Sequence, residues 1–287
     1  MTIIVSLFHI ATTETLCLLD DSLEVSEKIK SSESTNAKGI AIYMDKVIVA
    51  QKDNRNECYL LVYSKENFIL LNKVHIKETK DVHSIYISGS EVIAVSTGTN
   101  EIHYYDFRSI LKDNEACPRK KVNTLMTLNT AADVIHLNGL SSYKNHMFIS
   151  GFGAVKPDSR WSEAKDGFIL DIDSGEFINK EPLLHPHSIF IQDTDIYYCE
   201  SRKGIIYKNN RAIIKINGGY PRGLAVSSDS KEIYVGVSSR FYKEVKVSST
   251  KPEVFKYELD SENEYQASKR ISLGEPGSEI YDIVLLS

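Results

Sequence analysis

Six polar residues that could bind or transform a ligand each stand directly ahead of a short apolar run: Lys38, His83, Asn138, His187, Arg222 and Tyr281. The two histidines could share general acid and base roles, and Tyr281 could relay a proton. Lys38 and Arg222 favour an anion, because a guanidinium grips a carboxylate or phosphate through two hydrogen bonds. These residue types predict an anion-binding pocket with acid–base chemistry. A polar channel that holds only ordered water is the alternative.

The six residues belong to a repeat. Each opens the same phrase, in which an alternating apolar run, a turn and a second apolar run follow, at intervals of 35 to 59 residues. Short runs rich in Ile, Val, Tyr and Phe between Asp, Ser, Asn and Gly are typical of successive strands. The spacing fits units of four strands. We therefore predict an all-β protein, a six-bladed β-propeller with four-stranded blades, as a single domain over residues 1–287; two stacked sandwiches are the alternative.

The last unit is incomplete, because the chain ends after its first strand at 280–287. Apolar runs at 2–10, 14–20 and 23–30 could supply the second, third and outer strands. A blade shared in this way leaves no exposed strand edge within the ring. We therefore predict a closing blade made of the C-terminal strand and three N-terminal strands.

The inner strand of each blade lines the central channel, so the six residues should ring one channel mouth. The ends of the second strands open on the same face, which adds Gln51, Thr97, Ser150, Glu200 and Ser238, with Arg202 and Arg240 just beyond. Ligand sites favour such concavities. Trp161 lies in the longest polar loop and could stack on a sugar ring or only anchor its loop. His136 lies two residues before Asn138, on the same side of the strand. His185 is expected to have a surface or packing role.

Composition narrows the classes of partner. The net charge of −5 disfavours a nucleic-acid binder, and no apolar run reaches the roughly 18 residues that a membrane span needs. We therefore expect no nucleic-acid partner and no membrane partner. The start lacks the basic residues of a signal peptide, and three of the four cysteines lie in apolar runs, as small hydrophobes do. These features predict a cytoplasmic protein.

No cofactor is predicted, because the sequence contains no phosphate-binding or dinucleotide-binding glycine motif. A divalent metal held by His83, His187 and Glu200 with Asn138 is the alternative. Two cations in the same ring disfavour it.

Several phrases resemble a family of bacterial six-bladed propeller proteins of unknown function. These are HLNGL at His136, DGFILDIDSGE at Asp166, HPHS at His185, GYPRGLAV at Gly219 and EIYVGVSSR, which ends at Arg240. The resemblance covers roughly residues 82–240. It implies that His136, Asn138, His187, Arg222 and Arg240 belong to the family pattern, whereas Lys38 is supported by the repeat alone.

Two functions remain open, because propellers carry many unrelated activities. The first is a protein that binds, and as an enzyme would process, an anionic small molecule or carbohydrate at the channel mouth. His83, His187 and Tyr281 would then be catalytic in a lyase or epimerase, with a metal-dependent hydrolase as a further possibility. The ligand-binding residues would be Lys38, His136, Asn138, Trp161, Glu200, Arg202, Arg222 and Arg240. The alternative is a non-catalytic scaffold that holds a protein partner on its loop face.

Overall fold

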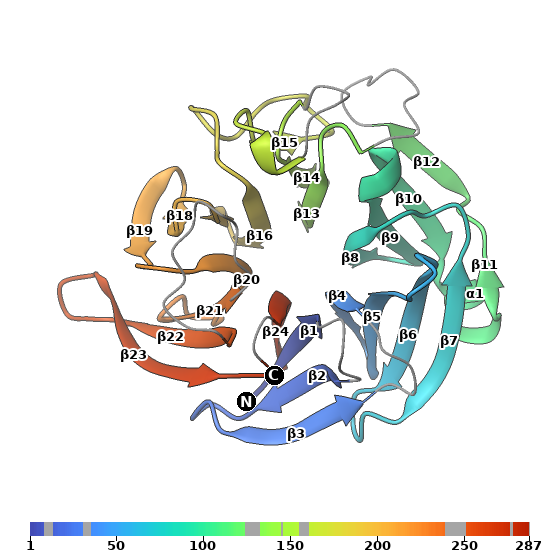
Figure 1. Ribbon diagram of the computed structural model, residues 1–287, viewed down its shortest axis with the longest axis horizontal. Helices are drawn as coiled ribbons and strands as arrows, with labels where there is room; N and C mark the ends of the chain where they lie inside the picture. Colours follow the sequence, from blue (N-terminus) through green and yellow to red (C-terminus); the bar gives the residue numbers. More distant parts are fainter. Residues whose placement is uncertain are drawn as a thin grey trace.

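The computed structural model describes residues 1–8, 14–30, 36–123, 133–144, 146–154, 161–238, 251–275 and 278–286. Its antiparallel strands form six blades in a ring around a central channel (Figure 1). Helices in the described residues are short: α1 (Phe107–Lys112), η1 (Thr97–Thr99) and η3 (Trp161–Glu163). None of the described helices is long and apolar enough to cross a membrane. The prediction of an all-β, six-bladed propeller is confirmed.

The closing blade joins the two ends of the chain, which lie side by side in Figure 1. Its strands from the channel outwards are β24 (Glu279–Leu286), β1 (Thr2–Phe8), β2 (Glu14–Leu19) and β3 (Val25–Lys30). β24 pairs with β1 along nearly its whole length, from Thr2 opposite Leu286 to Phe8 opposite Glu279. The predicted division of this blade is confirmed.

The other five blades follow in chain order. Blade 1 contains β4 (Asn36–Tyr43), β5 (Lys46–Lys52), β6 (Cys58–Ser64) and β7 (Leu70–Ile76), and the short β11 (Glu115–Ala116) pairs in parallel with β7. Blade 2 contains β8 (Val82–Ser88), β9 (Glu91–Ser96), β10 (Glu101–Asp106) and β12 (Lys120–Asn123). Blade 3 contains β13 (Leu137–Tyr143), β14 (His146–Gly151) and β15 (Phe168–Asp171). Its outer edge is formed by two isolated bridges, from Gly167 to Leu183 and from Leu170 to Phe177. Blade 4 contains β16 (Pro186–Gln192), β17 (Asp195–Glu200), β18 (Ile205–Lys208) and β19 (Arg211–Lys215). Blade 5 contains β20 (Tyr220–Val226), β21 (Glu232–Ser238), β22 (Glu253–Leu259) and β23 (Tyr265–Ser272).

The hydrophobic core lies between the blades. The described residues form six apolar clusters, and each combines side chains of two neighbouring blades. Both faces of a blade are therefore buried, which explains the near-continuous apolar runs of the inner strands. Cys17, Cys58 and Cys199 are buried in these clusters, as expected for small hydrophobes. Because every blade is held by its two neighbours, the positions that face the channel are rigidly placed.

Hydroxyl groups near the ends of the second strands tie neighbouring blades together. Ser6 Oγ donates to the Lys38 carbonyl at 2.6 Å, and Thr97 Oγ1 donates to the Leu137 carbonyl at 2.6 Å. Ser238 Oγ donates to the Ile280 carbonyl at 3.1 Å in the same manner. Thr97 and Ser238, predicted as part of a second ring around the mouth, thus bond to the inner strand of the next blade.

Candidate functional site

A β-bulge places the ring residues in the channel. The pairing register of the first five inner strands shifts at the ring position, for example between Ala37 and Ile40 in β4 and between His187 and Phe190 in β16. The pairing of β24 with β1 shifts at the matching place. A bulge inserts an extra residue and re-aims its side chain. The repeat therefore turns one polar side chain per blade towards the axis.

Tyr281 lies against three other members of this ring. The guanidinium carbon of Arg222 lies 3.8 Å from the centroid of the Tyr281 ring, and Lys38 Nζ lies 5.1 Å from it. The His83 ring meets Tyr281 edge to face, with 5.6 Å between centroids. Burial raises the pKa of Tyr281 to about 12, so the phenol keeps its proton near neutral pH. The structure thus brings Lys38, His83, Arg222 and Tyr281 into one cluster.

Each cation of the ring already has a carboxylate partner. Lys38 Nζ lies 2.6 Å from Asp81 Oδ1, and Lys52 Nζ lies 2.9 Å from the same oxygen. Arg222 forms an ion pair with Glu279, and both side chains are buried. An anionic ligand would therefore share these cations with Asp81 and Glu279.

Asp81 remains ionised through its neighbours. Burial alone would raise its pKa, but the positive charge of Lys38, the nearby His83 and the charge of Lys52 outweigh this effect and hold the pKa well below the usual range. His83 Nε2 lies 3.3 Å from Asp81 Oδ2, and His83 Nδ1 lies 3.3 Å from Asn138 Oδ1. Burial and the charge of Lys38 lower the pKa of His83 to about 3. The ring is therefore neutral at neutral pH and donates to only one of these two acceptors at a time.

His187 has a defined tautomer. Its Nδ1 lies 3.1 Å from the His185 carbonyl and 2.7 Å from Ser201 Oγ, whose own hydroxyl donates to the Pro221 carbonyl at 2.5 Å. Both neighbours can only accept from this nitrogen, so Nδ1 carries the hydrogen and Nε2 holds the lone pair. His187 Nε2 is buried without a hydrogen-bond partner among the described residues. Burial and the charge of Arg222 hold the pKa of His187 well below its usual range. His187 is therefore a fixed, unprotonated base.

The position after each ring residue alternates between glycine and a small polar residue around the channel: Gly39, Ser84, Gly139, Ser188, Gly223 and Asp282. A Cβ atom added to Gly39 would lie 2.7 Å from the Ile85 backbone nitrogen, and one on Gly139 would lie 3.0 Å from the Ser188 nitrogen. Neighbouring inner strands thus approach backbone to backbone at this level. Of two neighbouring inner strands, only one therefore has room for a side chain at this position.

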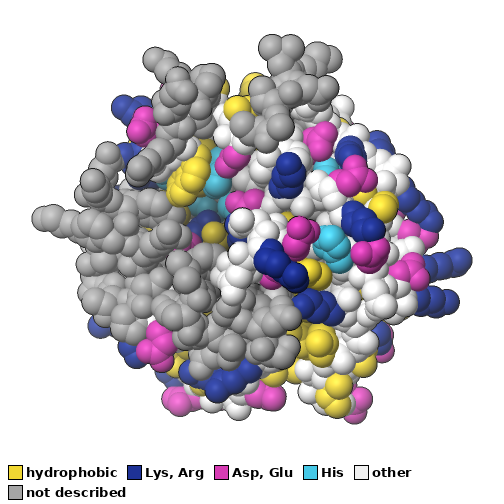
Figure 2. Space-filling view, turned by 45° about the vertical axis from the view of Figure 1, so that its right-hand side comes forward, with side chains coloured by type: hydrophobic (Ala, Val, Ile, Leu, Met, Phe, Trp, Pro, Cys, Tyr) yellow, Lys and Arg dark blue, Asp and Glu magenta, His cyan; other side chains and the backbone are white. Residues whose placement is uncertain are grey.

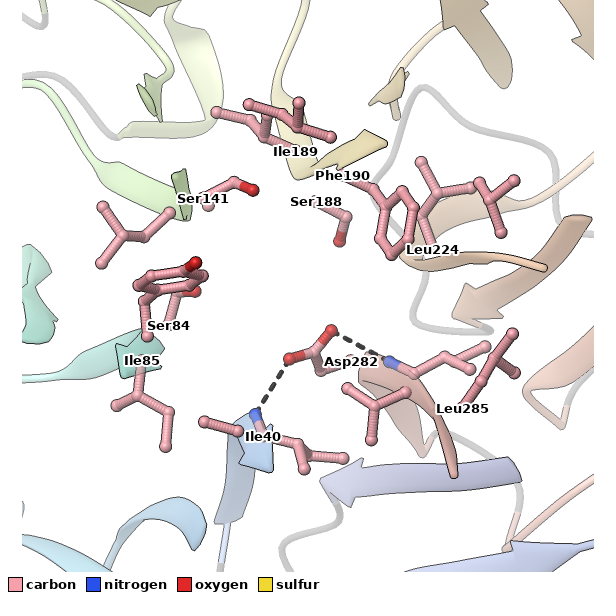
Figure 3. Close-up of a pocket in the computed structure, with 18 of the residues that line it drawn as sticks. Ile40, Ser84, Ile85, Ser141, Ser188, Ile189, Phe190, Leu224, Asp282 and Leu285 are labelled. Carbon is pink, nitrogen blue, oxygen red and sulfur yellow. Dashed lines mark hydrogen bonds between the residues drawn. The ribbon is translucent and has the colours of Figure 1, made fainter. Parts of the chain in front are cut away.

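Asp282 is the acidic member of that layer and points into the channel, as Figure 3 shows. Its Oδ2 accepts from the Ile40 backbone N–H at 2.9 Å, and its Oδ1 accepts from the Ile283 N–H at 3.0 Å. Burial raises the pKa of Asp282 to about 7, although these two hydrogen bonds lower it. A carboxyl group that gains and loses its proton near neutral pH therefore faces the same channel as His187.

The ring and the layer beneath it form one end of a cavity of about 760 Å³. The lining includes His83, Asn138, His187 and Tyr281 at this end. At the other end it includes Met1, Asp193 and Ser228, whose side chains are exposed. The cavity therefore reaches the surface where the inner strands end, on the face opposite to the predicted mouth.

Aromatic side chains cover the ring on the side of blades 3 and 4. Trp161 stacks on His136 with 4.6 Å between ring centroids, and Phe152 stacks on His185 at 4.4 Å. His136 Nδ1 lies 2.5 Å from Asp133 Oδ2. The structure thus places His136 and Trp161 together next to the ring, with the Trp161 indole engaged by His136. His185, for which a surface or packing role was expected, is buried against Phe152.

Two further predicted site residues, Glu200 and Arg202, form hydrogen bonds within the fold. The Glu200 carboxylate is buried within blade 4, where it accepts from the Leu184 N–H at 2.8 Å and from the Tyr207 hydroxyl at 3.0 Å. Arg202 donates to the Ser162 carbonyl at 3.2 Å. Arg240 lies outside the described residues. The described contacts thus give Glu200 and Arg202 partners within the fold.

No group of three or more His, Cys, Asp or Glu side chains in the described part of the chain is arranged to hold a metal ion. Glu200, which the metal alternative included, accepts hydrogen bonds from Leu184 and Tyr207. The described surface in Figure 2 mixes Lys and Arg with Asp and Glu side chains over the right-hand blades.

Asp81, Ser84, Ser188, Asp282 and Glu279 were not predicted from the sequence. For three of them a signal exists, because the residue after each ring position follows an alternating pattern of glycine with Ser84, Ser188 or Asp282. Asp81 lies two residues before His83, and Glu279 lies two residues before Tyr281. An acidic residue two positions ahead of a ring residue could therefore have indicated a carboxylate beside the ring.

Comparisons with known proteins agree with the fold. The family model described as "Domain of unknown function (DUF4915)" matches residues 2–287. No curated protein matches the sequence. Among solved structures, a chain of the nidogen/laminin complex is similar with a TM-score of 0.64 and 10% identity, covering 98% of this chain and 97% of that one. A hypothetical selenium-binding protein from Sulfolobus tokodaii gives 0.59 and 11%, covering 94% and 75%. A periplasmic gluconolactonase from Pseudomonas aeruginosa gives 0.56 and 12%, covering 94% and 82%. At these identities the likeness concerns the fold alone.

Proposed function

Since the chain belongs to the DUF4915 family of domains of unknown function, we propose its function from the channel itself: it binds a small carbohydrate or sugar acid there and acts on it by acid–base chemistry. The observation that carries this proposal is the unprotonated Nε2 of His187, a residue that lines the cavity and is fixed by its bonds through Nδ1; this nitrogen is buried without a partner among the described residues. Such an oriented imidazole is suited to removing a proton from a bound substrate.

The polar groups around His187 suit a ligand with several hydroxyl groups. Asn138 Nδ2 is a buried donor without a partner among the described residues. The side chains of Ser84 and Ser188 line the cavity close by. Buried polar groups need hydrogen-bond partners, and hydroxyl groups of a ligand would provide them. Lys38 and Arg222, which pack against Tyr281, would favour the carboxylate of a sugar acid through their positive charge, partly offset by Asp81 and Glu279.

The proposed reaction is proton abstraction next to a carboxylate. His187 Nε2 takes the proton from carbon, and the electron pair moves into the carboxylate as an enolate. Protonated Asp282 then returns a proton, either to the carbon from the other side, as in an epimerase, or to a departing hydroxyl group, as in a lyase. The two groups hold protons with different affinity because Asp282 has a raised pKa and His187 a lowered one. Tyr281, whose phenol keeps its proton, is a second proton donor.

The fold likeness to a gluconolactonase is too distant to name a substrate. The proposal that the ligand is a sugar rests on the polar groups that line the channel. The proposal that the ligand carries a carboxylate rests on the two cations of the ring, Lys38 and Arg222.

The test is a binding screen followed by a turnover assay. Purified protein is screened by thermal shift against neutral sugars, uronic acids, aldonic acids and their lactones, and hits are measured by calorimetry. Binding compounds are then incubated in deuterated water, and deuterium incorporation next to the carboxylate is followed by NMR. We expect His187→Gln to weaken binding at least tenfold and to abolish deuterium incorporation.

His146→Gln is the matched control. His146 is exposed and pairs with Asp171 at 2.7 Å on blade 3, away from the channel. This variant should bind and exchange as the unchanged protein does. If ligand binding and exchange survive in both His83→Ala and His187→Ala, the proposed site is wrong.

A further inference from the structure

The cavity beyond the polar ring borders the apolar core between the blades. The second position after each ring residue is an aliphatic side chain in all six blades: Ile40, Ile85, Leu140, Ile189, Leu224 and Ile283. These side chains are almost fully buried in the clusters between the blades. An apolar zone therefore follows directly after the polar ring, although it leaves little apolar surface in the channel at this level.

This apolar zone continues towards the opening. Ile42, Ile87 and Leu285 line the cavity farther along the inner strands, and they are only half-buried although they lie inside the ring. Apolar side chains that face an open channel gain free energy when a ligand removes them from water. Neither a sugar nor a sugar acid alone would cover them.

The size of the cavity is suited to more than a single sugar ring. Its volume of about 760 Å³ lies within the range of about 300 to 1,000 Å³ that drug-sized ligands occupy. Its polar end is closed by the Tyr281 cluster, and its other end reaches exposed Met1 and Asp193. A ligand would therefore enter by the Met1 end with its polar part first.

We propose that the ligand is amphipathic, with a polar head at the His187 and Asp282 end and an aliphatic or aromatic tail along the half-buried Ile42, Ile87 and Leu285 farther along the channel. The position of the head rests on the proposed function; the tail rests on the apolar walls alone. The tail leads to the opening on the face where the inner strands end.

The test measures affinity as a function of tail length. Two series of probes are titrated by calorimetry: n-alkyl β-glucosides from methyl to hexyl, and straight-chain carboxylates from acetate to octanoate. We expect affinity to rise roughly fourfold for each added methylene group in at least one series, until the tail reaches the opening. An affinity that does not change with tail length in either series, or no binding in both, overturns the proposal.

A blocking variant locates the tail. Ser142 lines the cavity near the end of β13, so Ser142→Trp should fill the channel and abolish the dependence on tail length. Ser88→Trp is the matched control, because Ser88 is exposed at the end of β8. The dependence should persist there. Circular dichroism checks that both variants fold, and the series on the unchanged protein tests the proposal even if one does not.

His187→Gln separates this inference from the proposed function. If it weakens every probe by the same factor and leaves the dependence on tail length intact, head and tail are both supported. If affinity rises with tail length but His187→Gln does not weaken the binding of any probe, the tail is supported and the proposed site is contradicted. Binding that requires His187 but ignores tail length supports the site and overturns the tail.

Discussion

The substitution Asp282→Asn tests the most unusual group in the channel. In the unfolded chain the Asp282 carboxyl titrates near 3.8, whereas burial in the folded protein raises its pKa to about 7. A carboxyl whose pKa rises on folding binds its proton more tightly in the folded state. It therefore destabilises the fold progressively as pH rises from 3.8 to 7. The contribution of Asp282 to the free energy of unfolding is most favourable below this pH range, where the carboxyl is protonated in both the folded and the unfolded state.

The size of the effect follows from the same pKa values. At about 1.4 kcal/mol for each pKa unit, the rise from 3.8 to about 7 corresponds to about 4 kcal/mol once pH exceeds 7. More than half of this falls between pH 5 and pH 8. Asparagine carries no charge at any pH, so the free energy of unfolding of Asp282→Asn should gain about this amount relative to the unchanged protein over that range.

Below pH 3.8, where Asp282 is protonated in both the folded and the unfolded state, the variant should be the less stable protein. The Asp282 oxygens accept from the Ile40 and Ile283 N–H groups, and an amide can accept through only one of its two terminal atoms. The other backbone N–H then loses its acceptor, at a cost of about 1 to 3 kcal/mol.

The assay is urea unfolding followed by circular dichroism at pH 5, 6, 7 and 8, with the m-value measured at each pH. Asp21→Asn is the matched control, because Asp21 is exposed in the turn between β2 and β3. Its difference from the unchanged protein should not vary with pH. The reasoning is refuted if the difference for Asp282→Asn is also constant from pH 5 to pH 8, since the carboxyl would then titrate alike in both states.

Three further predictions concern the ring. Deletion of residues 280–287 removes the strand that pairs with β1, so cooperative unfolding should be lost in a urea titration; a truncated protein that still unfolds cooperatively would contradict closure through β24. Gly39→Ala should lower the free energy of unfolding by about 1 to 3 kcal/mol, because the new Cβ would lie 2.7 Å from the Ile85 nitrogen; an unchanged melting temperature would show that the strands can separate there. Glu279→Leu should lower the free energy of unfolding by about 3 to 5 kcal/mol, because it leaves the buried Arg222 without its carboxylate. Adding Arg222→Met should recover most of this loss. A double variant that is no more stable than Glu279→Leu would contradict the role of this ion pair.

The fold could be predicted from local patterns. Inner strands buried on both faces are near-continuous apolar runs, and each run starts after one polar residue, so the repeat is visible without any knowledge of contacts. The shared closing blade follows from the same argument, because half a blade at each end leaves two unpaired edges. The ring of Lys38, His83, Asn138, His187, Arg222 and Tyr281 could be predicted for this reason, since a repeat places equivalent positions at equivalent points around the axis.

The partners of those residues depend on contacts between blades. The proximity of Asp81 to Lys38 and of Glu279 to Arg222 depends on how neighbouring blades pack. These carboxylates neutralise the positive charges that the ring residues alone would give the site. The tautomer of His187 likewise depends on Ser201 and on the Pro221 carbonyl of the next blade. Such contacts join residues far apart in the sequence, and no local pattern records them.

The sequence by itself determined a closed six-bladed ring and the one polar residue that each blade turns towards its axis, because both follow from periodicity along the strand. Only the tertiary structure decided which end of the channel is open, which charges are already paired, and that Asp282 faces the cavity. These properties depend on distances across the ring. A six-fold arrangement of strands brings together residues that the sequence separates by 276 positions, as in the bond from the Asp282 N–H to Ser6 Oγ.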